Sequence, residues 1–322
     1  MEKVVCVTGA SGYIASWLVK LLLERGYTVK ATVRNLSDPR KVAHLKSLEG
    51  AEERLHLYEA DLVEEGSFDS VVEGCEGVFH TASPVLFSTS DPQKDLIDPA
   101  VEGTINVLKS CKKVSTIKRV VVTSSMATVT FNYNPLTQDV VVDETWHSDP
   151  AFCEEYKQWY ALSKTLAEKA TWRFVEENCL DLVTLHPGFV IGPPLQLTLS
   201  LSCAGFLDLI KQGKELWPNG IYRYVDVRDV ALTHILVLEN PCANGRYCLV
   251  GRVAHSFQAL NILKHIFPSY NLPPMESEKQ KDSSLYQVSQ ERAKSLGINF
   301  RPLEISIKDT VESFIDNNFI TF

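Results

Sequence analysis

The chain has 322 residues, 45% of them hydrophobic, and a formal net charge of −8. This length is long for one simple domain and short for three, and the composition allows a substantial buried core. The acidic balance and the absence of a long basic run exclude nucleic acid as an expected main partner. No stretch approaches 18 uninterrupted apolar residues, so we expect no membrane span. The first apolar run reads as a strand rather than a signal peptide, and we expect a cytoplasmic protein.

The eight cysteines are scattered along the sequence. They form no Cys-x-x-Cys pair and no Cys/His cluster with the spacing of metal ligands, so we expect no metal. Reduced thiols are the ordinary state of such cysteines in the cytoplasm. The sequence leaves open whether Cys153 has a redox role and whether the protein is a monomer or a homodimer.

Short Val- and Ile-rich runs alternate with helical patterns over the first 190 residues. The predicted strands cover residues 4–8, 28–33, 55–59, 77–80, 119–123 and 181–186. The predicted helices cover residues 13–25, 41–48, 68–72, 96–113 and 154–178. Continuous apolar strands that alternate with helices indicate a parallel sheet covered on both faces. The expected fold class is therefore α/β, a doubly wound parallel sheet of the Rossmann type.

Beyond residue 188 the pattern loosens and prolines interrupt it, although helices are still predicted at 229–239, 256–267 and 305–317. We expect a dinucleotide-binding domain at 1–189 with a return to the sheet at about 225–245. The remaining segments, 190–224 and 246–322, would form a smaller C-terminal substrate domain.

A glycine-rich turn follows the first predicted strand and opens the first predicted helix. Small residues at positions 9, 12 and 15 permit a tight turn, close approach to a pyrophosphate, and close packing of helix on strand. The helix N-terminus adds free N–H groups and the positive end of the helix dipole. The predicted dinucleotide-binding residues of this turn are Thr8, Gly9, Ser11, Gly12, Tyr13 and Ile14.

The second predicted strand ends at Arg34, where an NAD-specific site usually carries an acidic residue for the ribose 2′-hydroxyl. A cation at this point, with Arg40 and Lys41 a few residues on, suits a 2′-phosphate and favours NADPH over NADH. The alternative is that Arg34 is only a solvated strand end. The ends of the third and fourth strands should also meet the cofactor, through Asp61 and Leu62 and through Thr81, Ala82 and Ser83. Asp61 suits a turn or a helix cap equally well.

Tyr160 and Lys164 are four residues apart in a helical pattern, so they share one helix face. A carbonyl that receives a hydride becomes an alkoxide and needs a proton, and a phenol with a pKa of about 10 is a weak acid for that task. A lysine ammonium nearby should lower the pKa of the phenol toward neutrality. Ser125 can hold the carbonyl oxygen beside it, with Ser124 as the alternative serine. These residue types fit reversible hydride transfer to a carbonyl.

These motifs, together with Pro187-Gly188, resemble the extended short-chain dehydrogenases. The runs at 15–19 and 159–168 resemble the plant dihydroflavonol-reductase-like branch, most closely phenylacetaldehyde reductases and cinnamyl-alcohol-dehydrogenase-like aldehyde reductases. The resemblance covers nearly the whole chain. It implies that Ser125, Tyr160 and Lys164 are catalytic and that Lys164 also binds the nicotinamide ribose. It further implies that Arg34 and Lys41 bind the 2′-phosphate, that Pro187, Gly188 and Val190 line the nicotinamide, and that Ser202 contacts the diphosphate.

The sequence also departs from two related groups. Cinnamoyl-CoA reductases carry Asn-Trp-Tyr-Cys-Tyr around the catalytic tyrosine, whereas this chain has Gln158 and Ala161 in place of the Asn and the Cys. Sugar-nucleotide epimerases usually bind NAD through an acidic residue, which Arg34 replaces here.

The resulting expectation is NADPH-dependent reduction of a small aromatic or arylalkyl aldehyde to the primary alcohol. The candidate pocket residues are Pro84, Phe87, Phe131, Phe189 and Tyr224, each of which also suits packing in the core. The alternatives are a dihydroflavonol-type ketone reductase, a cinnamoyl-CoA reductase, and a protein that senses NADPH without turnover.

Overall fold

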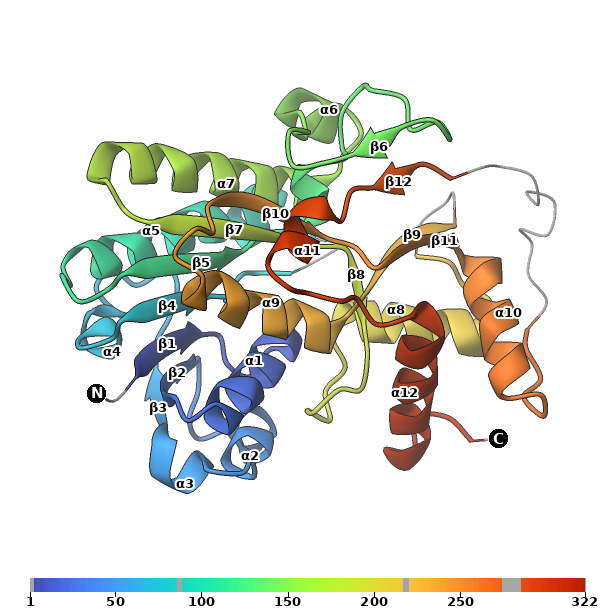
Figure 1. Ribbon diagram of the computed structural model, residues 1–322, viewed down its shortest axis with the longest axis horizontal. Coiled ribbons are helices and arrows are strands. Elements are labelled where there is room, and N and C mark those ends of the chain that lie inside the picture. The colour runs from blue at the N-terminus through green and yellow to red at the C-terminus, as the bar shows by residue number, and fades with distance from the viewer. Residues whose placement is uncertain (1–2, 86–88, 217–219, 274–284, 322) are drawn as a thin grey trace.

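A seven-stranded parallel sheet, covered by helices on both faces, forms the centre of the molecule (Figure 1). The computed structural model describes residues 3–85, 89–216, 220–273 and 285–321. The strand order is β10-β7-β5-β4-β1-β2-β3, with every neighbouring pair parallel. The strands are β1 (Val4–Thr8), β2 (Thr28–Val33), β3 (Leu55–Glu59), β4 (Gly77–His80), β5 (Arg119–Thr123), β7 (Leu182–Pro187) and β10 (Gly245–Leu249). The predicted doubly wound Rossmann fold is confirmed.

Four long helices cover the two faces of this sheet. On one face α1 (Tyr13–Glu24) packs against α9 (Val227–Glu239), and on the other α5 (Asp98–Lys112) packs against α7 (Trp159–Asn178) (Figure 1). Strands β1, β4, β5 and β7 are buried along almost their whole length, because both faces are covered. This burial explains why their sequences read as continuous apolar runs.

The remaining helices lie around the sheet and in the C-terminal part of the chain. They are α2 (Pro39–Lys46), α3 (Ala51–Arg54), α4 (Asp69–Val72), the π-helical turn η1 (Gln93–Ile97), the 3₁₀ turn η2 (Met126–Thr128), α6 (Pro150–Glu155), α8 (Leu201–Gln212), α10 (Ser256–Ile266), α11 (Glu291–Ser295) and α12 (Leu303–Asp316).

Two differences from the predicted helices have local causes. The helix predicted at 154–178 is two helices, because Lys157 adopts a left-handed φ of 53° and ends the first before the second begins. Helix α8 was not predicted, although its start and stop signals are present. Ser200 caps it by accepting a hydrogen bond from the Cys203 N–H, and Gly213 ends it at a φ of 66°.

Beyond β7 the chain leaves the sheet, returns to it, and leaves again. A three-stranded sheet in the order β11-β9-β8 is formed by β8 (Phe189–Ile191), β9 (Ile221–Asp226) and β11 (Arg252–His255). Strand β10 returns to the edge of the main sheet beside β7, and α9 precedes it. A two-stranded pair joins β6 (Val141–Val142) to β12 (Gln287–Val288).

All eight cysteines are unpaired thiols. Cys153 is fully buried, and burial raises the pKa of its thiol to about 11, so the environment does not activate it. Within the described ranges, no three His, Cys, Asp or Glu side chains group in a way that could hold a metal ion. No helix in the same ranges is long and apolar enough to cross a membrane.

Candidate active site

The glycine turn at the carboxyl end of β1 forms a cradle that only a glycine fits. Gly9 has a φ of 66°, and a Cβ added there would lie 2.9 Å from both the Cα and the Cβ of Ala82. The Thr8 hydroxyl accepts hydrogen bonds from the N–H groups of Thr81 and Ala82, both at 3.1 Å, which holds the ends of β1 and β4 together. Gly12 begins α1 without a side-chain cap. The turn therefore offers bare backbone to a ligand, as a pyrophosphate requires.

The side chains of this turn divide into two groups. Ser11 and Ile14 are partly buried. Tyr13 is buried, and its hydroxyl donates a 2.6 Å hydrogen bond to the Gly192 carbonyl oxygen, so its side chain belongs to the core. Only the backbone of Tyr13 can serve the role predicted for it.

The cations expected at the 2′-phosphate lie beyond the end of β2. Arg34 is exposed and Lys41 is half-buried, and within the described ranges neither has an ion-pair partner. Arg40 differs, because its guanidinium donates two 3.0 Å hydrogen bonds to the Asp38 carboxylate. Arg34 and Lys41 are thus the cations available to an incoming phosphate.

The residues at the ends of β3 and β4 have several roles. The Asp61 carboxylate caps a turn by accepting a 3.1 Å hydrogen bond from the Val63 N–H, as the alternative interpretation held. Leu62 packs close to α5, and its carbonyl oxygen accepts a 2.9 Å hydrogen bond from Asn106. Thr81, Ala82, Ser83 and Pro84 are partly buried and follow β4 past the glycine turn.

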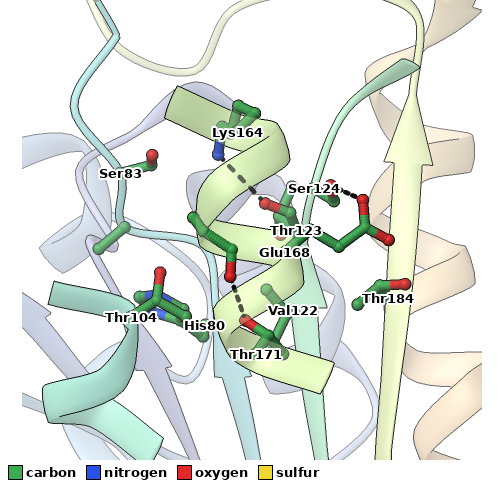
Figure 2. A pocket seen from close by; sticks show the side chains of 12 residues that line it. His80, Ser83, Thr104, Val122, Thr123, Ser124, Lys164, Glu168, Thr171 and Thr184 are labelled. Carbon is green, nitrogen blue, oxygen red and sulfur yellow. Dashed lines mark hydrogen bonds between the residues drawn. The ribbon is translucent and has the colours of Figure 1, made fainter. Parts of the chain in front are cut away.

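The structure brings Ser125, Tyr160 and Lys164 together at the carboxyl end of β5. The hydroxyls of Tyr160 and Ser125 share a hydrogen bond. The Ser125 Oγ also accepts a 3.1 Å hydrogen bond from the Ala127 N–H, which caps η2. The Lys164 Nζ donates to the Thr123 carbonyl oxygen at 3.3 Å (Figure 2). The alternative serine, Ser124, instead contacts the Glu168 carboxylate at 3.4 Å, so Ser125 is the serine beside the phenol.

Electrostatics at this cluster differ from the sequence expectation in one respect. Burial raises the pKa of the Tyr160 phenol, and the hydrogen bond from Ser125 offsets only part of that rise. Burial also lowers the pKa of the Lys164 ammonium to about 8, with the Glu168 carboxylate opposing the fall. The expected lowering of the tyrosine pKa by Lys164 is not found in this structure, where burial has the largest influence on that pKa and Ser125 the opposing one. A phenol that stays protonated is an acid, which suits donation of a proton.

A small cavity lies behind Lys164, between the sheet and α7 (Figure 2). Its volume of about 20 Å³ holds roughly one water molecule and is far too small for an aromatic substrate. The polar residues that line it include His80, Thr104, Ser124, Lys164, Glu168 and Thr184, beside the apolar Ala82, Val122 and Ala167. The site therefore has a water-sized compartment of mixed lining on its inner side.

The candidate substrate residues fall into three groups. Phe131 is partly buried and packs in the same apolar cluster as Trp159 and Tyr160. Phe189 and Tyr224 are buried at 9% and 1% exposure in an aromatic cluster with Tyr222, so these two predicted pocket residues are core. Phe87 lies outside the described residues.

The remaining predicted contacts follow β7. A Cβ on Gly188 would lie 2.1 Å from the Arg223 carbonyl oxygen, so a glycine is required there. Pro187 ends β7, and Val190 is buried in β8. Ser202 is in the first turn of α8, where its hydroxyl lies 3.2 Å from that of Ser200.

Sequence reasoning assigned no role to Glu168 and Arg246, which form a buried ion pair behind the cluster. The spacing of Glu168 from Lys164, four residues on one helix, was a signal that could have found it. Arg246 is 78 residues away along the chain, and no local pattern connects the two.

This doubly wound sheet, with a glycine turn after β1 and a Ser-Tyr-Lys cluster after β5, is the architecture of an extended short-chain dehydrogenase, a class of oxidoreductases. The sequence profile of the NAD dependent epimerase/dehydratase family matches residues 5–251. The chain belongs to this family, in its dihydroflavonol-reductase-like group.

Individual relatives agree with this assignment. Cinnamoyl-CoA reductase CAD2 of Medicago truncatula is 57% identical over 319 residues, which cover 99% of this chain and 98% of that protein. Vestitone reductase from alfalfa, Medicago sativa, has a similar structure with a TM-score of 0.86 and 34% identity, covering 99% of this chain and 100% of that one. Gre2 of Candida albicans, in complex with NADPH, gives a TM-score of 0.85 and 30% identity, covering 98% of this chain and 99% of that one.

Proposed function

We propose that the protein is an NADPH-dependent reductase that converts an aromatic or arylalkyl aldehyde, such as phenylacetaldehyde or cinnamaldehyde, to the primary alcohol. The observation that carries the proposal is the Tyr160 phenol, kept protonated by burial and hydrogen-bonded to Ser125, at the carboxyl edge of a dinucleotide-binding sheet. Ligands bind at that edge in doubly wound folds.

The residues present fit a phosphorylated dinucleotide. The glycine cradle at Gly9 would hold the pyrophosphate, while Arg34 and Lys41 would hold the 2′-phosphate. The NADPH complex of the Candida albicans relative supports the choice of cofactor. When bound, NADPH supplies the hydride.

In the proposed reaction, each member of the cluster has one role. The Ser125 hydroxyl donates a hydrogen bond to the substrate carbonyl oxygen and orients it. Tyr160 donates its proton to that oxygen as negative charge develops there. The Lys164 ammonium, one helix turn away, stabilises the phenolate that remains.

The expected aldehyde preference rests on apolar side chains. Phe131 and Trp159 pack against the same apolar cluster as Tyr160, and Leu197 and Leu201, in the segment from β8 into α8, are 75% and 40% exposed and could contribute an apolar wall. An apolar wall suits an aromatic ring, whereas a phosphosugar would require clustered cations. Apolar pockets discriminate weakly, so we expect several aldehydes to be accepted.

The second candidate is a cinnamoyl-CoA reductase, favoured by the 57% identity to cinnamoyl-CoA reductase CAD2 of Medicago truncatula. Against it, Gln158 and Ala161 stand where those reductases carry the Asn and the Cys of their motif. We therefore expect CoA thioesters to be poor substrates.

Steady-state kinetics with NADPH across phenylacetaldehyde, cinnamaldehyde, dihydroquercetin and feruloyl-CoA would test the proposal. We expect the highest kcat/KM on an aldehyde. A higher value for feruloyl-CoA than for the corresponding aldehyde would favour the second candidate, and a clear preference for dihydroquercetin would favour a ketone reductase. NADPH binding without turnover of any carbonyl would favour a sensing protein.

The unpaired cysteines support our proposal that the protein is cytoplasmic. We further propose that residues 1–189, with a return at about 225–245, form a dinucleotide-binding domain, and that residues 190–224 and 246–322 form a smaller substrate domain.

A further inference from the structure

A buried ion pair lies directly behind the catalytic cluster. Glu168 follows Lys164 by one turn of α7, and Arg246 is on β10; both side chains are less than a tenth exposed. The Arg246 Nε donates to the Glu168 carboxylate at 2.8 Å. Removing two charges from water is unfavourable unless every donor and acceptor of the pair has a hydrogen-bond partner. The other hydrogen-bond partners of Glu168 and Arg246 therefore show which parts of the chain the pair holds in place.

The other donors of Arg246 hold the loop that follows Ser125. Its Nη1 donates to the carbonyl oxygens of Glu144 at 2.7 Å and Trp146 at 2.6 Å, and its Nη2 donates to the Thr128 carbonyl oxygen at 3.3 Å. The Thr128 hydroxyl in turn donates to the Ser125 carbonyl oxygen at 3.0 Å. Arg246 therefore ties both ends of this loop to α7.

Glu168 lines the same small cavity as Lys164, and its carboxylate points toward Ser124 (Figure 2). The titratable groups that line this cavity are His80 from β4 and Lys164 and Glu168 from α7, while α5 and β5 contribute Thr104, Thr123 and Ser124. Behind Glu168, β7 supplies His186, whose Nε2 lies 3.4 Å from the carboxylate, and β10 supplies Arg246.

The charges in this compartment at neutral pH follow from burial. Burial lowers the pKa of His80 to about 3 and that of His186 to about 4, so both are neutral. Burial opposes ionisation of Glu168, but Arg246, a hydrogen bond from Thr128 and, once it is protonated below about pH 4, His186 lower the pKa of its carboxyl to about 2. Glu168 is thus the one anion among the described groups that line the cavity, and it lies one helix turn from Lys164, whose pKa it raises.

We propose that Glu168 is a positioning residue that keeps Lys164 protonated in its buried site and, through Arg246 and Thr128, fixes the loop that carries Ser125. This proposal rests on the proposed function, in which the Lys164 ammonium and Ser125 take part. It extends the Ser-Tyr-Lys cluster to a fourth side chain that acts through Lys164.

The decisive variant is Glu168→Gln, which keeps the shape and removes the charge. The readout is the titration of the Lys164 side chain by NMR in protein labelled with ¹³C,¹⁵N-lysine, with its signal assigned by loss in Lys164→Arg. No cofactor or substrate is present. We expect the wild-type midpoint near pH 8 and a fall of about one pH unit or more in Glu168→Gln. Glu176→Gln, an exposed position on the same helix, is the matched control and should leave the midpoint unchanged.

An unchanged Lys164 midpoint in Glu168→Gln would overturn the proposal. If Glu168→Gln does not fold, Glu168→Leu/Arg246→Met removes both buried charges together, a replacement that buried ion pairs often tolerate, and the same fall is expected.

The pH profile of kcat is the second measurement that tests the role of Glu168. We expect its alkaline limb to move to lower pH in Glu168→Gln by the same amount as the NMR midpoint. A limb that stays in place while the midpoint moves would overturn the role of Glu168 in turnover. Absence of turnover in the wild type would instead contradict the proposed function, and the NMR titration would still decide the effect of Glu168 on Lys164.

Discussion

The glycine turn and the catalytic cluster lie at the same edge of the sheet, but the first offers backbone groups to a ligand and the second offers side chains. The turn presents backbone, and the closest approach to Gly9 is an uncharged residue, Ala82. The cluster presents side chains from the segment between β5 and η2 and from α7, with buried charges behind them. Steric fit determines what the glycine turn can bind, whereas the pKa values of the side chains determine whether the catalytic cluster can transfer a proton. Steric and electrostatic substitutions should therefore affect the two regions differently.

The largest expected effect is on kcat, with no change in cofactor affinity. Tyr160→Phe removes the proposed acid, and loss of a general acid typically lowers kcat by about 10²–10⁴. NADPH affinity, measured by fluorescence titration, should stay close to that of the wild type. Tyr156→Phe, at an exposed tyrosine four residues earlier, is the control and should change neither value. Near-normal kcat in Tyr160→Phe would rule out the proposed acid.

Acid should weaken the fold through buried histidines. Burial lowers the pKa of His80 to about 3 and those of His186 and His234 to about 4, below the ordinary value of about 6.5. The unfolded chain therefore binds more protons between about pH 6.5 and 4, and the free energy of unfolding falls as pH drops through that window. We expect a loss of about 1–2 kcal/mol per histidine between pH 7 and 5.

Urea denaturation at the two pH values measures this loss. The glycine turn contains no titratable core group of this kind, so Gly9 variants should keep the same pH dependence. A free energy of unfolding that is equal at pH 7 and 5 would show that these histidines are not held neutral.

Gly9→Ala should act through shape. The added Cβ meets Ala82 at 2.9 Å in a backbone conformation that side chains disfavour, so we expect a loss of about 1–2 kcal/mol in stability and weaker NADPH binding. Gly26→Ala is the control, because Gly26 also has a positive φ of 78° but its Cβ would meet nothing within 4 Å. Equal NADPH affinity in the two variants would argue against a cofactor cradle at Gly9.

The smallest expected effect is on cofactor choice. Arg34→Ala should lower the ratio of kcat/KM for NADPH to that for NADH by about tenfold, because a charge-assisted phosphate contact is lost. Arg40→Ala should leave the ratio unchanged, since Asp38 already engages that guanidinium. A wild-type enzyme that prefers NADH would contradict the role given to Arg34.

The same contrast explains what the sequence could predict. The strands and the glycine turn are local patterns, and the structure confirms the fold that they indicated. Tyr160 and Lys164 are also a local spacing. The Glu168–Arg246 pair joins segments 78 residues apart, and the rise in the tyrosine pKa depends on burial by distant elements. Tyr224 and Phe189 looked like pocket residues because aromatic side chains serve cores and pockets alike.

The pairing of β6 with β12 has a consequence for synthesis on the ribosome. The first five strands of the sheet end at residue 123, and their contacts can form early, because N-terminal segments emerge first. The loop that follows Ser125 can be fixed only later, because it is held by hydrogen bonds from Arg246 and by pairing of β6 with the strand at Gln287–Val288. A nascent chain can therefore pair the first strands of its sheet well before its catalytic loop is held, and we expect turnover only once residue 288 has been translated.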